Sequence, residues 1–307
     1  MSEEAAPTLK KEYSVISPER KSRDNFYVDP AFANEICLHI LKNAVRKMNP
    51  PLMLAIQGPK GEGKTQQVRE VCSRIGVTIL QISGSVISGG EEKEPLRLIR
   101  DAYVDAGNIW ITRKNPVVIM IDDIDTSTIA VQSDRRYGVN TQLVSGTLMH
   151  IADDPNNVGD RSTMRIPIIL TGNNFQTLYG PLIRRGRMRF FDWVPSLETK
   201  SHVVQTIFSD LIPPQELAHI PDMVRKYAHE PVAFYAELKN DLVDDLIVQA
   251  LHSAPEFDFR SMLMQLENTV IRTNFKRLME LAEQKQARIA LNFNADDRTV
   301  QMPQEIY

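Results

Sequence analysis

Cysteine is scarce in this chain of 307 residues, which has only Cys37 and Cys72. The two are far apart, form no Cys-x-x-Cys pair and have no histidine nearby at metal-ligand spacing. We therefore expect two reduced thiols rather than a disulfide framework or a metal site. Such cysteine usage is typical of a cytoplasmic protein, which is the location we predict.

Long apolar runs and an excess of one charge are also missing. Runs such as Val117–Ile121 are far shorter than the roughly 20 residues of a membrane-spanning helix. The acidic N-terminus has no apolar stretch of the kind found in signal peptides, so we expect neither targeting nor membrane association. Lys and Arg total 36 against 39 Asp and Glu, a net charge of −3 that gives no overall attraction for nucleic acid.

The composition that is present, 42% hydrophobic and 24% charged, predicts a folded globular protein. Between residues 52 and 171, short apolar runs alternate with helical patterns. The predicted strands are Leu52–Ile56, Thr78–Ile82, Val117–Ile121 and Ile166–Thr171. This alternation predicts an α/β fold, a parallel sheet with helices on both faces. A helix over Ala31–Met48 precedes the first strand.

After Trp193-Val194-Pro195 the strand pattern ends and amphipathic helical patterns follow. These patterns cover Glu198–Leu211, Pro214–Tyr227, Pro231–Leu251 and Phe259–Arg288. We predict a flexible N-terminal arm at residues 1–24, an α/β domain at 25–195, a small all-α domain at 196–290 and a loose C-terminal tail at 291–307.

The strongest motif has the spacing Gly-x-x-x-x-Gly-Lys-Thr and lies between a predicted strand and a predicted helix. In that context backbone N–H groups and the positive helix end converge on a phosphate, whereas a chance surface turn requires no such flanks. Lys64 is expected to contact the β- and γ-phosphates of ATP, and Thr65 to bind Mg²⁺. The predicted nucleotide-binding residues are Gly58, Pro59, Lys60, Gly61, Glu62, Gly63, Lys64, Thr65 and Gln66.

The strand Val117–Ile121 ends in two carboxylates, Asp122 and Asp123. This is a Walker B pattern, which predicts that Asp122 holds Mg²⁺ and that Asp123 orients the attacking water. Aspartates at the end of a strand can also be simple turn formers. The position two strand units after a phosphate loop favours the catalytic interpretation.

Two further signals follow the last predicted strand. Asn173 stands at its carboxyl end, where ligands bind in parallel sheets, and can position water beside the γ-phosphate. Arg184 and Arg187 lie in a Gly-Arg turn a few residues later. A guanidinium supplied by a neighbouring subunit would stabilise transition-state charge, although an asparagine turn and a solvated arginine turn are the simpler alternatives.

In this order, the phosphate loop, Asp-Asp strand, strand-end Asn, Gly-Arg turn and helical domain resemble the AAA+ ATPases. Four longer segments are similar to the AAA+ module of Rubisco activases, and together they span most of residues 24–210. These segments are Asp24–Phe32, Leu148–Pro155, Pro167–Phe175 and Leu178–Met188.

The resemblance implies an AAA+ P-loop NTPase domain with a helical lid, working as a ring, usually a hexamer, that uses ATP hydrolysis to remodel a protein partner. By the same resemblance Asn173 is the sensor-1 residue, and Arg184 and Arg187 reach a neighbour's nucleotide. Lys239 occupies the place of the sensor-2 arginine. The pore-loop segments correspond to Ser83–Glu92 and Thr126–Gly138, which as plain sequence are equally typical of mobile loops.

The sequence departs from the activases at three places, of which Lys239 in place of the sensor-2 arginine is one. About two dozen residues precede Asp24, so we expect the N-terminal domain that engages Rubisco to be missing; the partner stays open, with Rubisco as one candidate. The Walker B motif ends Asp-Asp where the activases typically have Asn-Asp, which still predicts hydrolysis. A nucleic-acid machine and a nucleotide-gated scaffold remain the alternatives, the former because Arg135, Arg136 and Arg161 lie in predicted loops.

Overall fold

The structure is a computed structural model. It describes residues 12–18, 26–89, 94–125, 135–178, 180–253, 259–260, 263–264 and 272–299. By its contacts the chain divides into two units, Met1–Val194 and Pro195–Tyr307, each with its own hydrophobic core.

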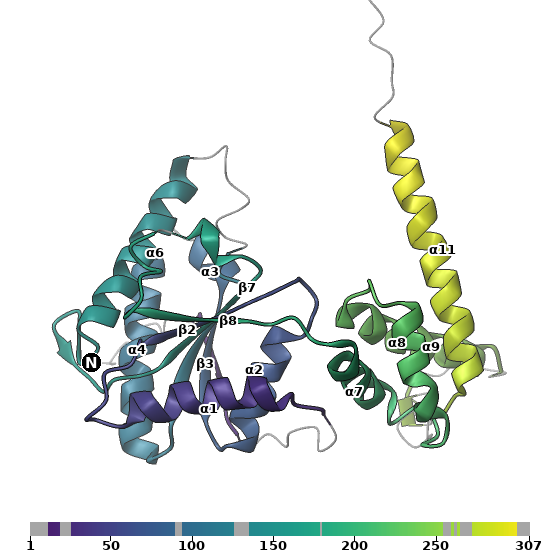
Figure 1. Cartoon of the computed structure of the whole chain (residues 1–307), viewed down its shortest axis with the longest axis horizontal. Helices are drawn as coiled ribbons and strands as arrows, with labels where there is room; N and C mark the ends of the chain where they lie inside the picture. The colour runs from purple at the N-terminus through teal and green to yellow at the C-terminus, as the bar shows by residue number, and fades with distance from the viewer. Residues whose placement is uncertain are drawn as a thin grey trace, which may run out of the picture. The chain divides into compact units, whose positions relative to one another are not determined.

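The first unit is built on a central sheet (Figure 1). The strand order in this sheet is β1-β3-β4-β7-β2-β8. Its strands are β1 (Ser14–Ile16), β2 (Met53–Gln57), β3 (Thr78–Ser83), β4 (Val117–Asp122), β7 (Ile168–Gly172) and β8 (Met188–Asp192). All neighbours are parallel except β1, which is antiparallel to β3. The predicted parallel sheet is confirmed, and each of the four predicted strands is present within two residues of its expected limits.

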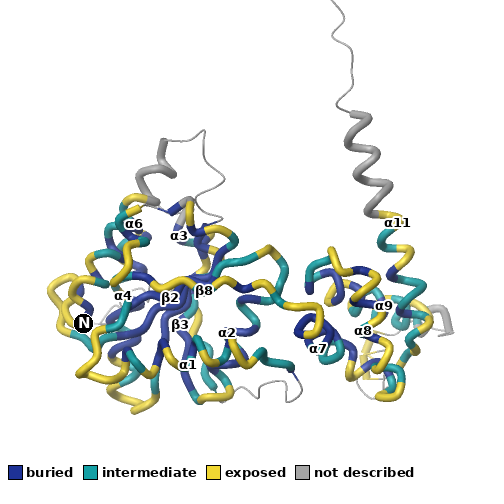
Figure 2. Tube along the Cα trace, viewed as in Figure 1, coloured by how far each residue is buried: buried dark blue, intermediate teal, exposed yellow. Residues whose placement is uncertain are grey.

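Helices cover both faces of this sheet, as predicted. They are α1 (Pro30–Ala44), α2 (Lys64–Arg74), α4 (Glu94–Arg113) and α6 (Arg135–Asp153). Alternate strand residues enter different cores because successive side chains of a strand point to opposite faces. Ile119 and Ile121 pack with α4 and α6, whereas Val118 and Met120 pack with α1 and α2. The central strands β2, β3, β4 and β7 are the most completely buried part of this unit (Figure 2).

Two strands of the sheet were not predicted, and both are edge strands. β8 has three exposed residues in its five, Arg189, Phe190 and Asp192, so its apolar signal is weak. β1 has three residues and lies in the segment expected to be a flexible arm. Its Val15 and Ile16 are β-branched and pair with Leu80 and Ile79 of β3, a partner that the local sequence does not reveal.

The first unit also has four short elements. They are α3 (Gly84–Gly89), η1 (Phe175–Thr177), β5 (Asn157–Val158) and β6 (Arg161–Ser162), the last two forming an antiparallel pair. Gly84 is required where α3 begins, because a Cβ there would lie 2.3 Å from the Asp123 carbonyl oxygen. The chain after β3 therefore packs directly against the end of β4.

The second unit is helical in the described residues, as predicted. Its elements are α7 (Leu197–Phe208), η2 (Glu216–His219), α8 (Ile220–Lys226), α9 (Val232–Ser253) and α11 (Phe275–Thr299). Their apolar faces share one core around Phe208, Tyr235 and Leu278. Ser196 begins α7 by accepting a hydrogen bond from the Thr199 N–H at 3.1 Å, which satisfies one of the helix's first free donors.

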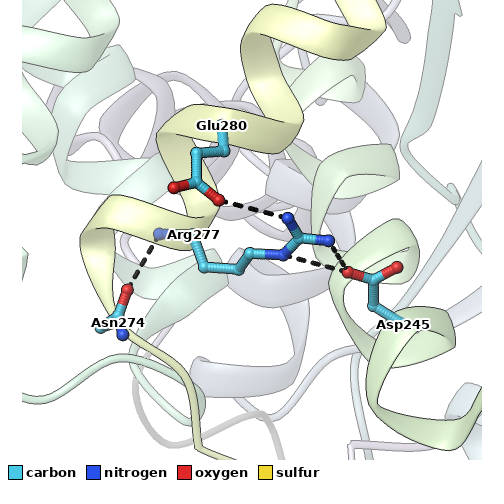
Figure 3. Close-up of polar contacts among 4 residues, drawn as sticks. All are labelled: Asp245, Asn274, Arg277 and Glu280. Atoms are coloured by element: carbon cyan, nitrogen blue, oxygen red, sulfur yellow. Dashed lines mark hydrogen bonds and ion pairs between the residues drawn. The ribbon is translucent and has the colours of Figure 1, made fainter. Parts of the chain in front are cut away.

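Arg277 joins two helices of this unit (Figure 3). Its Nε is 3.1 Å from an Asp245 oxygen on α9, and its Nη1 is 3.2 Å from Glu280 one turn along α11. The Arg277 N–H donates to the Asn274 side chain at 2.9 Å, which caps α11. The helical pattern predicted over Phe259–Arg288 is therefore wrong at residues 272–274, which precede α11 and are not helical.

The loose tail predicted from residue 291 is also wrong for residues 291–299, which continue α11. The polar composition was misleading, because the stretch from Phe275 to Thr299 has no glycine or proline to end a helix. Residues 90–92 and 126–134 of the predicted pore loops, and residues 1–11 and 19–25 of the region around the arm, lie outside the described residues. No helix in the described part is long and apolar enough to span a bilayer.

Candidate functional site

The phosphate loop joins β2 to α2 and contains three glycines with positive φ, Gly58, Gly61 and Gly63. At Gly58 a Cβ would lie 2.0 Å from the Trp193 carbonyl oxygen, so only glycine fits. The Trp193 indole N–H donates to the Glu62 carbonyl at 2.8 Å. Trp193, which follows β8, thus contacts the loop at both Gly58 and Glu62. Pro59 and Lys60 at the tip of the loop are exposed.

Lys64, the first residue of α2, is buried and folds back into the loop. Its Nζ donates to the carbonyls of Gly58 and Pro59, each at 2.8 Å, and lies 3.4 Å from the Asn173 amide oxygen. Burial lowers the pKa of this ammonium, and nearby carboxylates, Asp123 first, act against that shift. The structure therefore brings the predicted phosphate lysine and the predicted sensor together.

Thr65 and Asp122 also meet as expected for a shared metal ion. The Thr65 hydroxyl donates to Asp122 Oδ1 at 2.5 Å, and the Thr171 hydroxyl donates to the same oxygen at 2.6 Å. A hydroxyl and a carboxylate at the end of a phosphate loop are the hard oxygen donors with which proteins hold Mg²⁺ beside a phosphate. The residues present thus fit this ion.

Asp123 follows β4 in the left-handed region, with φ +53°. This conformation is uncommon for residues other than glycine. Its backbone N–H donates to the Thr171 hydroxyl at 3.1 Å. Burial, and then the adjacent Asp122 charge, raise the pKa of the Asp123 carboxyl, a direction that suits a group handling a proton of water.

Asn173 is held by a residue that the sequence analysis did not select. Asp125 is fully buried, and its Oδ2 accepts from the backbone N–H groups of Asn173 at 2.6 Å and Asn174 at 3.0 Å. Gly172 permits this approach, since a Cβ there would be 2.9 Å from Asp125 Oδ1. The third acid of the run Asp122-Asp123-Ile124-Asp125 was the available signal for this residue.

The two arginines of the Gly-Arg turn differ. Arg187 is held within its own unit, because Nε and Nη2 are each 2.7 Å from an Asp153 oxygen and Nη1 donates to the Pro181 carbonyl at 2.9 Å. Arg184 is exposed, and its guanidinium is paired with no residue that the structure describes. Neither lies at the carboxyl edge of the sheet, because the Met53 N–H donates to the Arg187 carbonyl at the start of β2.

Two predicted nucleotide contacts are engaged elsewhere. The Gln66 side chain donates to Glu70 one turn along α2 at 2.9 Å. Lys239 belongs to the second unit, where its Nζ is 2.7 Å from both carboxylate oxygens of Asp210. The sequence analysis overlooked Thr171 and Trp193, whose roles depend on contacts between distant strands that no local pattern reveals.

Comparison with known proteins agrees with this geometry. Residues 54–196 match the family model of the ATPase family associated with various cellular activities (AAA). The Rubisco activase 2 of Larrea tridentata is 33% identical over 296 residues, which is 87% of this chain and 68% of that protein. The activases of Phaseolus vulgaris and Anabaena are 36% and 35% identical over 73% and 74% of this chain.

The chain spans about half the length of several of these relatives, 52% of the Phaseolus vulgaris and 56% of the Anabaena protein. The residues that match the family model, 54–196, include the phosphate loop and the strands β3, β4, β7 and β8. The order β8-β2-β7-β4-β3 places the three motifs on β2, β4 and β7, which are adjacent strands. The chain belongs to the AAA ATPase family and is a relative of the Rubisco activases.

Proposed function

We propose that this chain binds ATP with Mg²⁺ at the carboxyl edge of the sheet and hydrolyses it. The observation that supports this most is the convergence of the motifs, with Lys64 Nζ 3.4 Å from Asn173 and Thr65 Oγ1 2.5 Å from Asp122. These residues come from three different strand–loop junctions, and a common phosphate ligand accounts for their meeting.

Each side chain has a distinct role in this proposal. Lys64 exchanges its two carbonyl partners for phosphate oxygens, and the free N–H groups at the start of α2 add to that attraction. Thr65 and Asp122 hold the metal ion, which neutralises phosphate charge when it is bound. Asp123 orients the attacking water, and Asn173 fixes its position from the neighbouring strand.

We further propose that sites are shared in a ring, with six subunits as the expected size. The Arg184 turn lies at the amino end of β2, and the phosphate loop lies at its carboxyl end. Five residues of strand separate them, about 17 Å at about 3.3 Å per residue. Arg184 therefore suits the phosphate of an adjacent subunit rather than its own, and Arg187 with its Asp153 partner shapes the turn that presents it.

The proposed partner is a protein that the ring remodels. The relatives are named as activases of ribulose bisphosphate carboxylase/oxygenase, so Rubisco is the first partner to test. A nucleic-acid partner is less favoured, because Arg161 forms an ion pair with Asp101 at 2.7 Å. Free Cys37 and Cys72 support the cytoplasm as the proposed compartment.

The decisive experiment measures phosphate release from Mg·ATP by the parent chain and by Asp123→Asn, with the particle mass followed by light scattering. We expect turnover and a ring-sized particle for the parent, and ATP binding without turnover for the variant. The ATP-bound variant is then titrated with purified Rubisco and, separately, with single-stranded DNA at two salt concentrations. Absence of ATP binding in the parent would refute the proposal, and salt-sensitive DNA binding alone would replace the protein partner.

A further inference from the structure

A chain of hydrogen bonds connects helix α2 to the second oxygen of Asp122, on the side away from Thr65. Gln81 of β3 donates from Nε2 to Asp122 Oδ2 at 3.0 Å. The Oε1 atom of Gln81 in turn accepts from Arg69 Nε at 3.2 Å and Nη2 at 2.7 Å. Thr65 and Arg69 both belong to α2, so the contacts close a ring of four side chains.

The secondary structure explains why these four side chains meet. Ile79 on β3 and Met120 on β4 face the core beneath α2, so Gln81 and Asp122, two residues further along each strand, face the same side. Thr65 and Arg69 are four residues apart and share one face of α2. Helix α2 therefore acts on both oxygens of the Asp122 carboxylate. Thr65 contacts Oδ1 directly, and Arg69 acts on Oδ2 through Gln81.

Arg69 determines which way the Gln81 amide faces. A guanidinium has only donors, so the two Arg69 contacts require the Gln81 oxygen and leave its NH₂ group for Asp122. The reversed amide would place an oxygen against the carboxylate and NH₂ against the guanidinium, which are two unfavourable pairs. Because Gln81 is half-buried, water would compensate for only part of the hydrogen bonds lost in the reversed orientation.

We propose that Gln81, oriented by Arg69, is a positioning residue that aims the Asp122 carboxylate for Mg²⁺ binding. The inference rests on the proposed function. The Gln81 amide holds Asp122 Oδ2 and so leaves Oδ1 directed at Thr65. Asp122 Oδ1 and Thr65 Oγ1 are the two oxygens that would hold the metal ion. Partners of metal ligands typically contribute roughly tenfold to a hundredfold in metal affinity.

The test uses the full chain and measures the affinity of a non-hydrolysable ATP analogue by calorimetry, with Mg²⁺ and with EDTA. Gln81→Met keeps the length of the side chain and removes the amide. The gain in affinity on adding Mg²⁺ should fall roughly tenfold to a hundredfold, while the affinity in EDTA stays at the parental value. An equal Mg²⁺ gain in parent and variant would overturn the proposal.

A second variant keeps the test valid if Gln81→Met fails to fold. Arg69→Met leaves Gln81 in place but removes the group that fixes its amide, so the Mg²⁺ gain should fall by a smaller factor, and Arg69→Lys should recover part of it. Arg189→Met is the matched control, because it removes an exposed ion pair to Glu35 in the same unit. Loss of the Mg²⁺ gain in the control, or an unchanged gain in Arg69→Met, would contradict the proposed chain of contacts.

The two proposals fail in different ways. If the parent shows no affinity for the analogue, or no gain from Mg²⁺, the proposed nucleotide site itself is wrong. If the parent shows the gain and the Gln81 and Arg69 variants match it, only the positioning role is wrong. Thermal unfolding of each variant without ligand separates a loss of fold from a loss of metal affinity.

Discussion

The two edges of the central sheet both contain buried or half-buried polar side chains, but these side chains serve different purposes. At the carboxyl edge, Thr65 and Asp122 bond mainly to other side chains that a ligand can replace. At the amino edge, His39 lies 3.1 Å from the Ile168 carbonyl, and Asn43 donates to the carbonyls of His39 at 2.9 Å and Pro51 at 3.2 Å.

Arg165 completes the network at the amino edge, with Nε 2.8 Å from the Asn43 oxygen and Nη1 3.2 Å from Asn49. The network links the end of α1 to the loop before β2 and to Ile168 of β7, so it serves the fold. At the carboxyl edge, the Thr65 hydroxyl and the Asp122 carboxylate partner each other and can turn to a metal ion, while the Lys64 ammonium can leave the Gly58 and Pro59 carbonyls for a phosphate. The two edges therefore differ in chemistry: the carboxyl edge gathers a lysine, a hydroxyl and a carboxylate suited to phosphate and metal, whereas the amino edge uses amide groups and Arg165 to fix backbone segments in place.

The largest expected effect tests whether the amino edge also serves a neighbouring subunit. Arg184→Ala should lower turnover by about a thousandfold, because the group that stabilises transition-state charge is removed, with ATP affinity nearly unchanged. Phosphate release and nucleotide titration measure the two quantities. Arg185→Ala, an exposed arginine beside it, is the matched control.

Mixing sharpens that test. Arg184→Ala and Asp123→Asn subunits should each be inactive, but a mixed ring has some interfaces at which an intact Asp123 meets an intact Arg184. Partial activity should therefore return on mixing. We expect Arg187→Ala to lose turnover as well, with a lower melting temperature, because its Asp153 pairing is also lost. Parental turnover in both arginine variants would contradict the shared site.

Lys64→Ala should weaken ATP binding by about a hundredfold, since a charged hydrogen-bonding partner of the phosphates is worth about 3 kcal/mol. Its contacts in the free protein are two loop carbonyls, so the free energy of unfolding should change little. Titration with a fluorescent ATP analogue measures the affinity, and urea unfolding measures the free energy of unfolding. Asp123→Asn is the counterpart that keeps binding, and unchanged affinity in Lys64→Ala would refute the phosphate-loop assignment.

His39 makes the stability depend on pH at the amino edge. Burial lowers its pKa from 6.5 to about 4, and Arg189 and Arg165 add to the effect. The unfolded chain therefore binds the proton first, and stability present above pH 6.5 is lost as the pH falls toward 4, by up to about 3 kcal/mol. Urea unfolding of the parent and of His39→Gln at several pH values measures this. An equal dependence of the unfolding free energy on pH in both proteins would contradict a buried neutral histidine.

Arg165→Met should have the smallest effect, a loss of about 1–3 kcal/mol in unfolding free energy, because Asn43 and Asn49 lose a donor. ATP affinity should remain at the parental value, since the residue lies at the opposite edge from Lys64. Chemical unfolding measures the loss of stability, and nucleotide titration measures the ATP affinity. A loss of ATP affinity without a loss of stability would break the division between the two edges.

Local sequence was enough for the parts of the protein that follow a local rule. Strand β4 is a run of apolar residues that ends at Asp122 and is followed by Asp123. The central strands of the sheet appear within two residues of their predicted limits, because burial on both faces requires such apolar runs. The phosphate loop follows from its glycine spacing. Edge strand β1 and the capped start of α11 were missed, because a short exposed strand and an asparagine cap leave faint patterns.

The sequence by itself determined the α/β class, the helical second unit and the identity of the phosphate, metal and water-orienting candidates. Only the tertiary structure decided which of them meet and what supports them. Asp125 beneath Asn173, Gln81 beside Asp122 and Asp153 on Arg187 are each separated from their partners by more than thirty residues. Hydrogen bonds depend on position in space, and strand order rather than chain order sets that position.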